Sequence, residues 1–116
     1  MLQEFISNLY SYRNRIGLLI GHYSISLMRA YISGACTVFW LNGDNEAYEA
    51  FDRSWREYVD VYYGLKPGDG VQGWHRLIKQ HTTSEKEAIE VFYSLLEKYL
   101  KEKYPYIIID CQESFE

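Results

Sequence analysis

The sequence predicts a mainly α-helical protein, a compact single-domain bundle of four to five helices with a short extended segment at its C-terminal end. Three observations predict this fold class. Apolar residues recur at helical spacing through most of the chain, and strong turn signals separate these segments. The clearest β-branched run, Ile107–Ile109, is a lone strand candidate without a partner. The 116 residues fit one domain, residues 1–116, and the apolar fraction of 47% is typical of a globular protein.

The first helix is predicted over Leu2–Tyr10, where the apolar residues fall on one face. From Ser11 to Tyr23 the helical periodicity fails, and Gly17 and Gly21 bracket a short apolar run. This stretch is interpreted as a glycine-punctuated connector that presses its apolar residues against the core.

Ser24 stands where it can cap a second helix, in which Gly34 would let another backbone approach closely. The turn signal Asn42-Gly43-Asp44 follows this helix. The apolar positions at helical spacing are Ile25, Met28, Tyr31, Ile32, Ala35, Val38 and Phe39.

A third helix is predicted from Glu46 to Tyr62, because apolar and charged residues separate onto two faces. The face expected to be buried carries Ala47, Phe51, Ser54, Trp55, Tyr58, Val61 and Tyr62. The face expected to be exposed carries Glu49, Asp52, Arg53, Arg56, Glu57 and Asp60.

The segment Lys66–Gly70 is the strongest loop signal in the chain, and a short helix is predicted after it, over Gln72–Gln80. Ser84 and Glu87 have the spacing of a capping box, so the last helix begins beside them. That helix ends before Pro105. The short helix is expected to bury Trp74, Leu77 and Ile78, and the last helix Ala88, Phe92, Leu95, Leu96, Tyr99 and Leu100.

No pattern of catalytic or metal-ligating residues is present. His22, His75 and His81 lack the spacing of a helical zinc site and are expected on the surface. Cys36 lies in an apolar run, which indicates a buried free thiol, and Cys111 is 75 positions away. We therefore expect no catalytic residue, no metal, no cofactor and no enzymatic activity.

Composition and charge narrow the range of partners. The net charge of −4 disfavours direct binding to nucleic acid. No stretch approaches the roughly 20 apolar residues of a membrane-spanning helix, and the first residues lack a signal-peptide pattern, so we expect a cytoplasmic protein without membrane contact. The 12 tyrosines exceed what a core of this size requires, which indicates a contact surface.

Acidic residues concentrate in residues 42–70, which hold seven acids against three bases, and in the last 13 residues. Such a surface is suited to a partner with a basic surface, such as a nuclease whose cleft binds phosphates. Tyrosines beside the acids would add apolar contact area. The partner-binding residues predicted on this basis are Asp44, Tyr48, Glu49, Asp52, Asp60, Tyr63 and Asp69.

Several short motifs across residues 5–100 resemble a pattern in small bacterial immunity-type proteins, the antidotes encoded at polymorphic-toxin and contact-dependent growth-inhibition loci. That pattern reads R-x-R-P-G-x-Y-x-G and then S-I-x-x-L-x-x-F-I-x-G; here Ile16 and Leu19 replace its Pro and Tyr. The similar segments are Arg13–Gly21, Ser24–Leu27, Tyr31–Gly34, Phe51–Tyr58, Gly73–Ile78 and Phe92–Leu96. The resemblance implies a protein that binds and neutralises a cognate toxin by occluding its active site, and it carries over no individual functional residue.

Two other classes of function stay open at this point. One is a generic protein–protein interaction or regulatory module without enzymatic activity. The other is an enzyme whose site assembles from residues scattered in the sequence. A toxin gene directly upstream would favour the immunity function over both.

Overall fold

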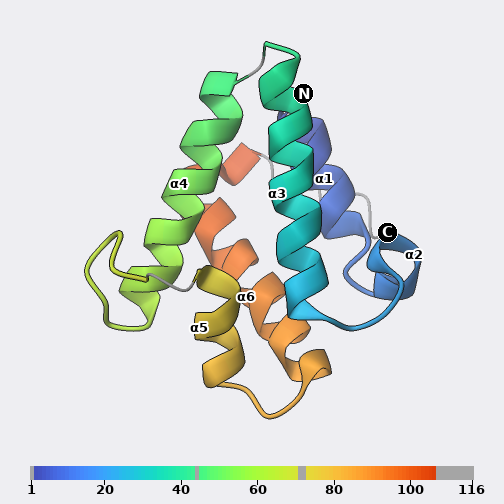
Figure 1. Cartoon of the computed structure of the whole chain (residues 1–116), viewed down its shortest axis with the longest axis vertical. Coiled ribbons are helices and arrows are strands. Elements are labelled where there is room, and N and C mark those ends of the chain that lie inside the picture. The colour runs from blue at the N-terminus through green and yellow to red at the C-terminus, as the bar shows by residue number, and fades with distance from the viewer. Residues whose placement is uncertain (1, 44, 71–72, 107–116) are drawn as a thin grey trace.

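The computed structural model describes residues 2–43, 45–70 and 73–106. Its helices are α1 (Leu2–Ser11), α2 (Ile16–Ile20), α3 (Ile25–Leu41), α4 (Asn45–Tyr62), α5 (Trp74–Gln80) and α6 (Glu85–Lys103) (Figure 1). The prediction of a mainly α bundle with four to five helices is confirmed, and no strand occurs within these ranges. The five-residue α2 is an addition inside the predicted connector, and Ile107–Ile109 lies outside the described residues.

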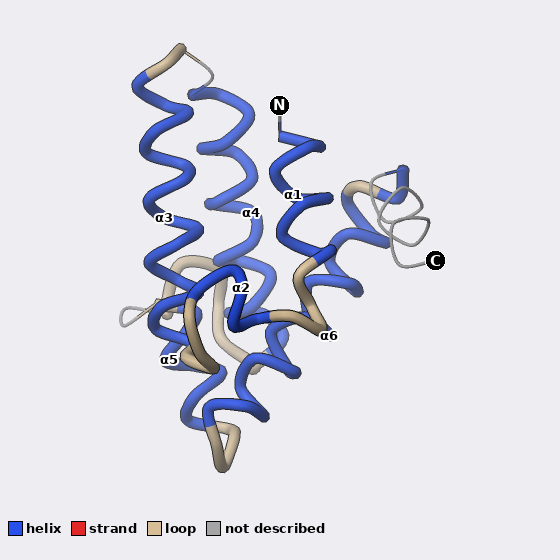
Figure 2. Tube along the Cα trace, turned by 90° about the vertical axis from the view of Figure 1, so that its right-hand side faces the viewer, coloured by secondary structure: helices blue, strands red, loops and turns tan. Residues whose placement is uncertain are grey.

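The four longest helices form a front pair, α3 and α4, and a rear pair, α1 and α6 (Figure 1). α3 and α4 run side by side at the front of Figure 1, with α1 behind α3 and α6 behind both. In the turned view of Figure 2, α3 lies at the outer edge of the molecule, while α6 runs along the opposite side. One long side of α3 is therefore turned away from the rest of the bundle.

Aromatic side chains from three helices form the centre of the core. The ring of Trp55 in α4 lies 5.5 Å from the ring of Trp74 in α5 and 5.6 Å from that of Phe92 in α6. The ring of Tyr99, about two helical turns further along α6 than Phe92, is also 5.6 Å from Trp55. Edge-to-face pairs of this kind stabilise a core beyond the apolar area that they bury. The tyrosine excess is thus partly used in the core, against the sequence-based expectation.

The buried faces of α1 and α6 are those predicted from the sequence, but the face of α4 is rotated. α4 buries Tyr48, Phe51, Trp55, Val59 and Asp60, whereas the predicted core positions Ala47, Val61 and Tyr62 are exposed. The buried face of α4 was predicted from helical spacing alone. Packing of α4 against Trp74 and Phe92 decides which of its aromatic side chains are actually buried. Val38 of α3, also predicted to be buried, is exposed.

Contacts between α1 and α6 join parts of the chain that are far apart in sequence. The buried hydroxyl of Tyr93 donates a hydrogen bond of 2.9 Å to the carbonyl oxygen of Leu9. Nearby, a guanidinium nitrogen of Arg13 lies 3.4 Å from a carboxylate oxygen of Glu97. These bonds fix the N-terminal helix onto the last one.

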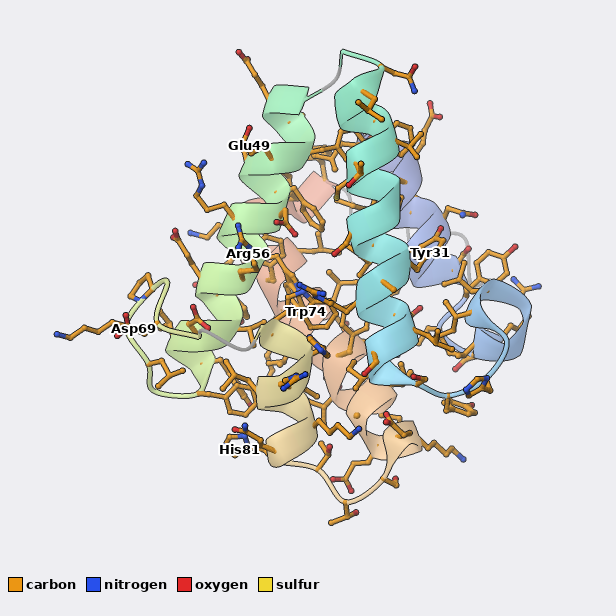
Figure 3. All side chains as sticks on the ribbon, viewed as in Figure 1. Tyr31, Glu49, Arg56, Asp69, Trp74 and His81 are labelled. Atoms are coloured by element: carbon orange, nitrogen blue, oxygen red, sulfur yellow. The ribbon has the colours of Figure 1, made fainter. Side chains whose placement is uncertain are left out.

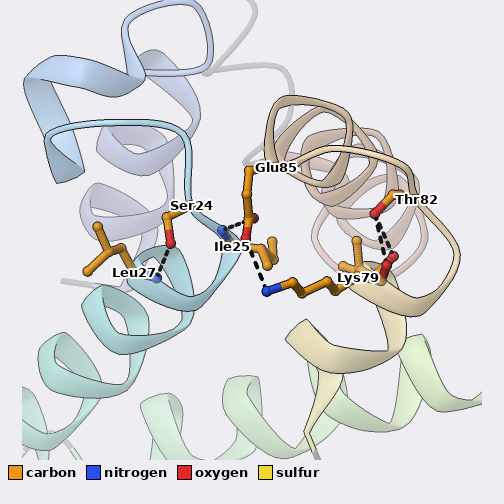
Figure 4. A network of polar contacts seen from close by, with 7 residues as sticks. Ser24, Ile25, Leu27, Lys79, Thr82 and Glu85 are labelled. Atoms are coloured by element: carbon orange, nitrogen blue, oxygen red, sulfur yellow. Dashed lines mark hydrogen bonds and ion pairs between the residues drawn. The ribbon is translucent and has the colours of Figure 1, made fainter.

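Polar contacts tie the ends of α3, α5 and α6 together (Figure 4). The carboxylate of Glu85 accepts a 3.1 Å hydrogen bond from the N–H of Ile25 and lies 3.3 Å from Nζ of Lys79. The hydrogen bond from Ile25, together with Lys79, lowers the pKa of Glu85. The hydroxyl of Ser24 accepts from the N–H of Leu27 at 3.2 Å, which confirms the predicted cap of α3.

The capping box that the sequence predicts at the start of α6 is confirmed. The N–H of Glu87 donates a 3.1 Å hydrogen bond to the hydroxyl of Ser84. In return, the Glu87 carboxylate accepts a 3.1 Å hydrogen bond from the N–H of Thr83, one residue before the usual donor, which is the N-cap residue. The first of these bonds satisfies a backbone donor that the helix itself leaves without a partner.

Candidate interaction surface on α3 and α4

A groove of about 440 Å³ lies between α3 and α4 and contains three of the residues predicted to bind a partner. Its floor and walls combine two carboxylates, two hydroxyls, a thiol and one tyrosine ring. The lining residues are Ser33, Cys36, Thr37, Tyr48, Glu49 and Asp52. We call this site the α3–α4 groove.

The two carboxylates of the groove are paired along α4. An oxygen of Glu49 lies 3.2 Å from a guanidinium nitrogen of Arg53, and one of Asp52 lies 3.2 Å from Nε of Arg56. Both pairs have the i, i+4 spacing of helix ion pairs and lie near solvent, where each contributes about 0.3–0.5 kcal/mol. The groove edge therefore alternates acid and base, instead of carrying the purely acidic face that the charge map predicts.

Tyr48 is a core residue, which corrects its assignment as an exposed contact. Only 1% of its surface is accessible, and its ring stacks on Phe39 with centroids 4.4 Å apart. Because tyrosine has an apolar body and a polar tip, its place in the sequence did not show which part would meet solvent. Tyr48 can form the wall of the groove but offers no apolar area for a partner to cover.

Asp60 is also buried, against the prediction that it lies on an exposed acidic face. It is 4% accessible, and its carboxylate accepts a 3.0 Å hydrogen bond from the N–H of Gly68. A side chain at Gly70 would collide with the same carboxylate. Asp60 therefore anchors the glycine-rich loop to α4. The sequence contained a signal for this contact, because a carboxylate near the end of a helix is followed by a loop rich in glycine N–H groups.

The remaining predicted residues do not join the groove. Tyr63 is half-buried and its ring stacks on His81 at 4.3 Å, while Asp69 is exposed in the loop after α4. Figure 3 shows Glu49 and Asp69 near opposite ends of α4. Asp44 lies outside the described residues. The structure thus brings together Glu49 and Asp52, with Tyr48 beneath them, and separates the others.

The thiol in the groove is protonated at neutral pH. Burial, with the nearby Asp52 carboxylate, raises the pKa of Cys36 to about 11. Because the thiolate is the reactive form of cysteine, this side chain is a poor nucleophile. The half-buried Cys36 serves instead as packing between α3 and α4.

His75 corrects the expectation that all three histidines lie on the surface. Its side chain is 9% accessible, and its buried Nδ1 has no hydrogen-bond partner among the described atoms. Burial and the positive charges of Arg29, Arg76 and Lys79 lower its pKa. Its place inside the predicted helix Gln72–Gln80, next to Trp74, which was expected to be buried, was the signal in the sequence. His22 and His81 are exposed, as predicted.

Two exposed apolar regions were missed by the sequence-based assignment of the site. One is the outer side of α3, where Val38 and Leu41 are exposed. The other is a groove of about 450 Å³ between α4 and the end of α6, with Tyr58, Val61 and Tyr62 on its α4 side. The low number of charges in α3, which contains only Arg29, was the signal for the first.

Comparisons with protein-family models, curated proteins and solved structures found no match to this chain. Within residues 2–43, 45–70 and 73–106, no helix has the length and apolar character needed to cross a membrane. The same residues contain no group of three or more His, Cys, Asp or Glu side chains placed to hold a metal ion.

Proposed function

We propose that this chain is an immunity-type protein that binds a cognate protein toxin and neutralises it by occluding its active site. The observation that carries the proposal is the α3–α4 groove, where carboxylates and hydroxyls lie together on two neighbouring helices (Figure 1). The motifs that resemble immunity-type proteins support the same function, and two of them, Tyr31–Gly34 and Phe51–Tyr58, lie on these two helices.

The ion pairs at the groove suit an exchange of partners on binding. Arg53 and Arg56 are exposed, so their contacts with Glu49 and Asp52 are weak and easily broken. A toxin with a basic cleft would present its own cations to these two carboxylates in place of the two arginines. A nuclease has such a cleft because its substrate is polyanionic, and carboxylates would then lie where phosphates bind.

The partner is to be sought in the protein encoded directly upstream, expressed with its catalytic residue disabled. The double variant Glu49→Lys/Asp52→Lys is expected to associate with it at least tenfold more slowly at low salt, because steering depends on the local charge. The measurement is the association rate constant by surface plasmon resonance across a salt series.

The matched control carries the same change in net charge at a distance from the groove. Glu4 and Glu90 are exposed on α1 and α6, so Glu4→Lys/Glu90→Lys should keep the parental rate to within about twofold. If both double variants associate equally slowly, net charge alone explains the effect, and the groove is not the binding site. Binding at the parental rate by the groove variant would also exclude the groove, and a toxin that does not bind the parent chain at all would exclude the function.

The alternative function, an interaction or regulatory module, predicts binding to a partner that is not toxic. Cell survival separates the two. Under the immunity proposal, co-expression of this chain restores growth to cells that produce the active upstream protein, and the groove variant protects them less well than the control variant.

A further inference from the structure

α3 carries very little charge although it lies at the edge of the molecule (Figure 2). Arg29 is the one charged residue among its 17 positions. The solvent-facing side of a surface helix normally carries charged and polar residues. In this structure α3 contacts the other helices along one side, and the turned view in Figure 2 places it at the outer edge.

The uncovered side of α3 carries a continuous row of apolar and small residues. Leu27, Val38 and Leu41 are 38%, 55% and 71% accessible, and Ala30 and Gly34 are exposed between them. Successive members are separated by three, four, four and three positions, so they share one face of the helix. We call this row, Leu27, Ala30, Gly34, Val38 and Leu41, the α3 stripe.

The α3 stripe is symmetric about Gly34. Leucine stands seven positions before and seven positions after this glycine, and Ala30 and Val38 stand four positions before and after it. A two-fold rotation about Gly34 places Leu27 of one copy opposite Leu41 of the other. The same rotation places the small Ala30 opposite the larger Val38. A surface with this property is complementary to itself, as a two-fold interface requires.

No contact within residues 2–43, 45–70 and 73–106 explains the glycine at the centre of the stripe. A Cβ atom at Gly34 would have no neighbour within 4 Å, and the backbone there is ordinary α-helix without a positive φ. Glycine within a helix is destabilising by roughly 0.5–1 kcal/mol relative to alanine. The close approach that the sequence predicted at Gly34 is therefore not made by any described part of this chain.

We propose that the α3 stripe binds a second copy of this chain, as an antiparallel helix pair that crosses at Gly34. The glycines lie on the two-fold axis, where the missing side chains let the two backbones approach to the lower end of the 8–10 Å range for packed helices. Leu27 of each copy packs on Leu41 of the other, and Ala30 packs on Val38. This interface is separate from the proposed toxin contact at Glu49 and Asp52.

Charge favours a second copy as the occupant. The five residues of the stripe are uncharged, so pairing desolvates no ionised group and places no like charges in contact. The antiparallel arrangement also sets the positive end of each helix dipole beside the negative end of the other.

The area of the stripe sets the strength of the pairing. A helix of 17 residues is roughly 25 Å long, and one helix pair buries less than the roughly 1,200–2,000 Å² of a standard stable interface. The dimer is therefore reversible and depends on concentration, as contacts of small area are.

Sedimentation velocity over a concentration series tests the pairing. The parent chain is expected to change from monomer to dimer, and Gly34→Glu is expected to raise the dissociation constant at least tenfold, because two carboxylates then meet at the axis. The matched control is Gly17→Glu, which adds the same charge at another exposed helical glycine with open space around it and should leave the constant within twofold.

Each result of this experiment decides the proposal. Gly34→Glu has space for its side chain in the monomer, so a loss of dimer with unchanged or higher thermal stability supports the interface. A parent chain that stays monomeric up to about 1 mM overturns it, as does equal dissociation by the two glutamates. If the parent is monomeric and Gly34→Glu instead loses toxin binding, the stripe contacts the toxin and the self-pairing is wrong.

Disulfide cross-linking tests the antiparallel register. In a chain with both natural cysteines replaced by serine, Gly34→Cys should form a disulfide-linked dimer by itself, because the axis brings the two positions together. Leu27→Cys should not link to itself but should link to Leu41→Cys when the two variants are mixed. Self-linking of Leu27→Cys would indicate a parallel pair and would contradict the proposed arrangement.

Discussion

α6 and α3 are both long and both rich in apolar residues, but they use these residues differently. α6 turns eight side chains into the core and places its charged residues toward solvent. α3 buries Ile25, Met28 and Ile32 and leaves Val38 and Leu41 exposed on its other side. The apolar residues of α6 are thus all satisfied by the fold, whereas those of α3 extend beyond what the fold covers.

The difference separates stability from binding. A residue that is covered within the chain stabilises the fold, and its replacement leaves a cavity. An apolar residue that is exposed contributes little to the fold, and a row of such residues marks a contact surface. Substitutions in α6 should therefore unfold the protein, and substitutions on the α3 stripe should change its association only.

The largest expected effect is on α6. Phe92→Ala should lower the free energy of unfolding by about 3–5 kcal/mol, because Phe92 is fully buried between Trp55 and Trp74. The measurement is urea denaturation followed by far-ultraviolet circular dichroism. Leu41→Ala on α3 is the counterpart and should change the same quantity by no more than about 0.5 kcal/mol. Similar losses of unfolding free energy at Phe92 and Leu41 would contradict the distinction between the covered α6 and the exposed α3 stripe.

Asp60 extends the comparison to α4, where a charged residue is used by the fold. Asp60→Ala should lower the free energy of unfolding by roughly 1–3 kcal/mol, because the N–H of Gly68 loses its buried acceptor. Asp69→Ala, in the same loop but exposed, serves as the control and should have no measurable effect. Equal stability of the two variants would mean that the buried hydrogen bond does not hold the loop.

Glycine substitutions should act in opposite directions in the two regions. Gly34→Ala should raise the free energy of unfolding by about 0.5–1 kcal/mol, because alanine is the better helix former and its Cβ meets open space. Gly70→Ala should lower it, because the added Cβ would collide with the carboxylate of Asp60. A destabilised Gly34→Ala variant would show that α3 is packed more closely than the structure indicates.

The smallest expected effect depends on pH and on His75. Burial and nearby cations hold its pKa below 6.5 in the folded chain, so the unfolded chain binds a proton more readily. Stability should therefore fall as pH falls below about 6.5 and should be independent of this group above it. His75→Gln should give a shallower decline of the melting temperature between pH 7 and pH 5 than the parent, and His22→Gln, exposed in the connector, should not. If the melting temperature of His75→Gln declines as steeply as that of the parent, His75 is not the cause of the decline.

The sequence predicted α6 well because its buried positions are aliphatic or aromatic and its exposed positions are charged. The stripe from Ala88 to Leu100 is confirmed, and so is the capping box at Ser84. The fold class and the order of the helices follow from the same kind of pattern. α2 was missed because a helix of five residues is too short to display a periodicity.

The candidate site was predicted less well because it depends on amphipathic residues. Tyr48 and Tyr62 both lie on α4 and both fit a core or a surface, and the structure buries the first and exposes the second. Asp60 fits a solvated face until the loop that wraps back onto it is known. Contacts between elements far apart in sequence decide these cases, and helical spacing does not contain them.

The bonds between α1 and α6 have a consequence for the order in which the protein folds during synthesis. Leu9 and Arg13 find Tyr93 and Glu97 as partners 84 positions later, so these two bonds cannot form until α6 has left the ribosome. α3 and α4 are neighbours in sequence and pair directly, and a ribosome adds only about 5–20 residues each second. For several seconds of every synthesis, the nascent chain therefore presents an α3–α4 hairpin whose Trp55 still lacks its partner Phe92 from α6. Chaperones that bind exposed apolar helices should therefore occupy this chain more in that interval than after folding is complete.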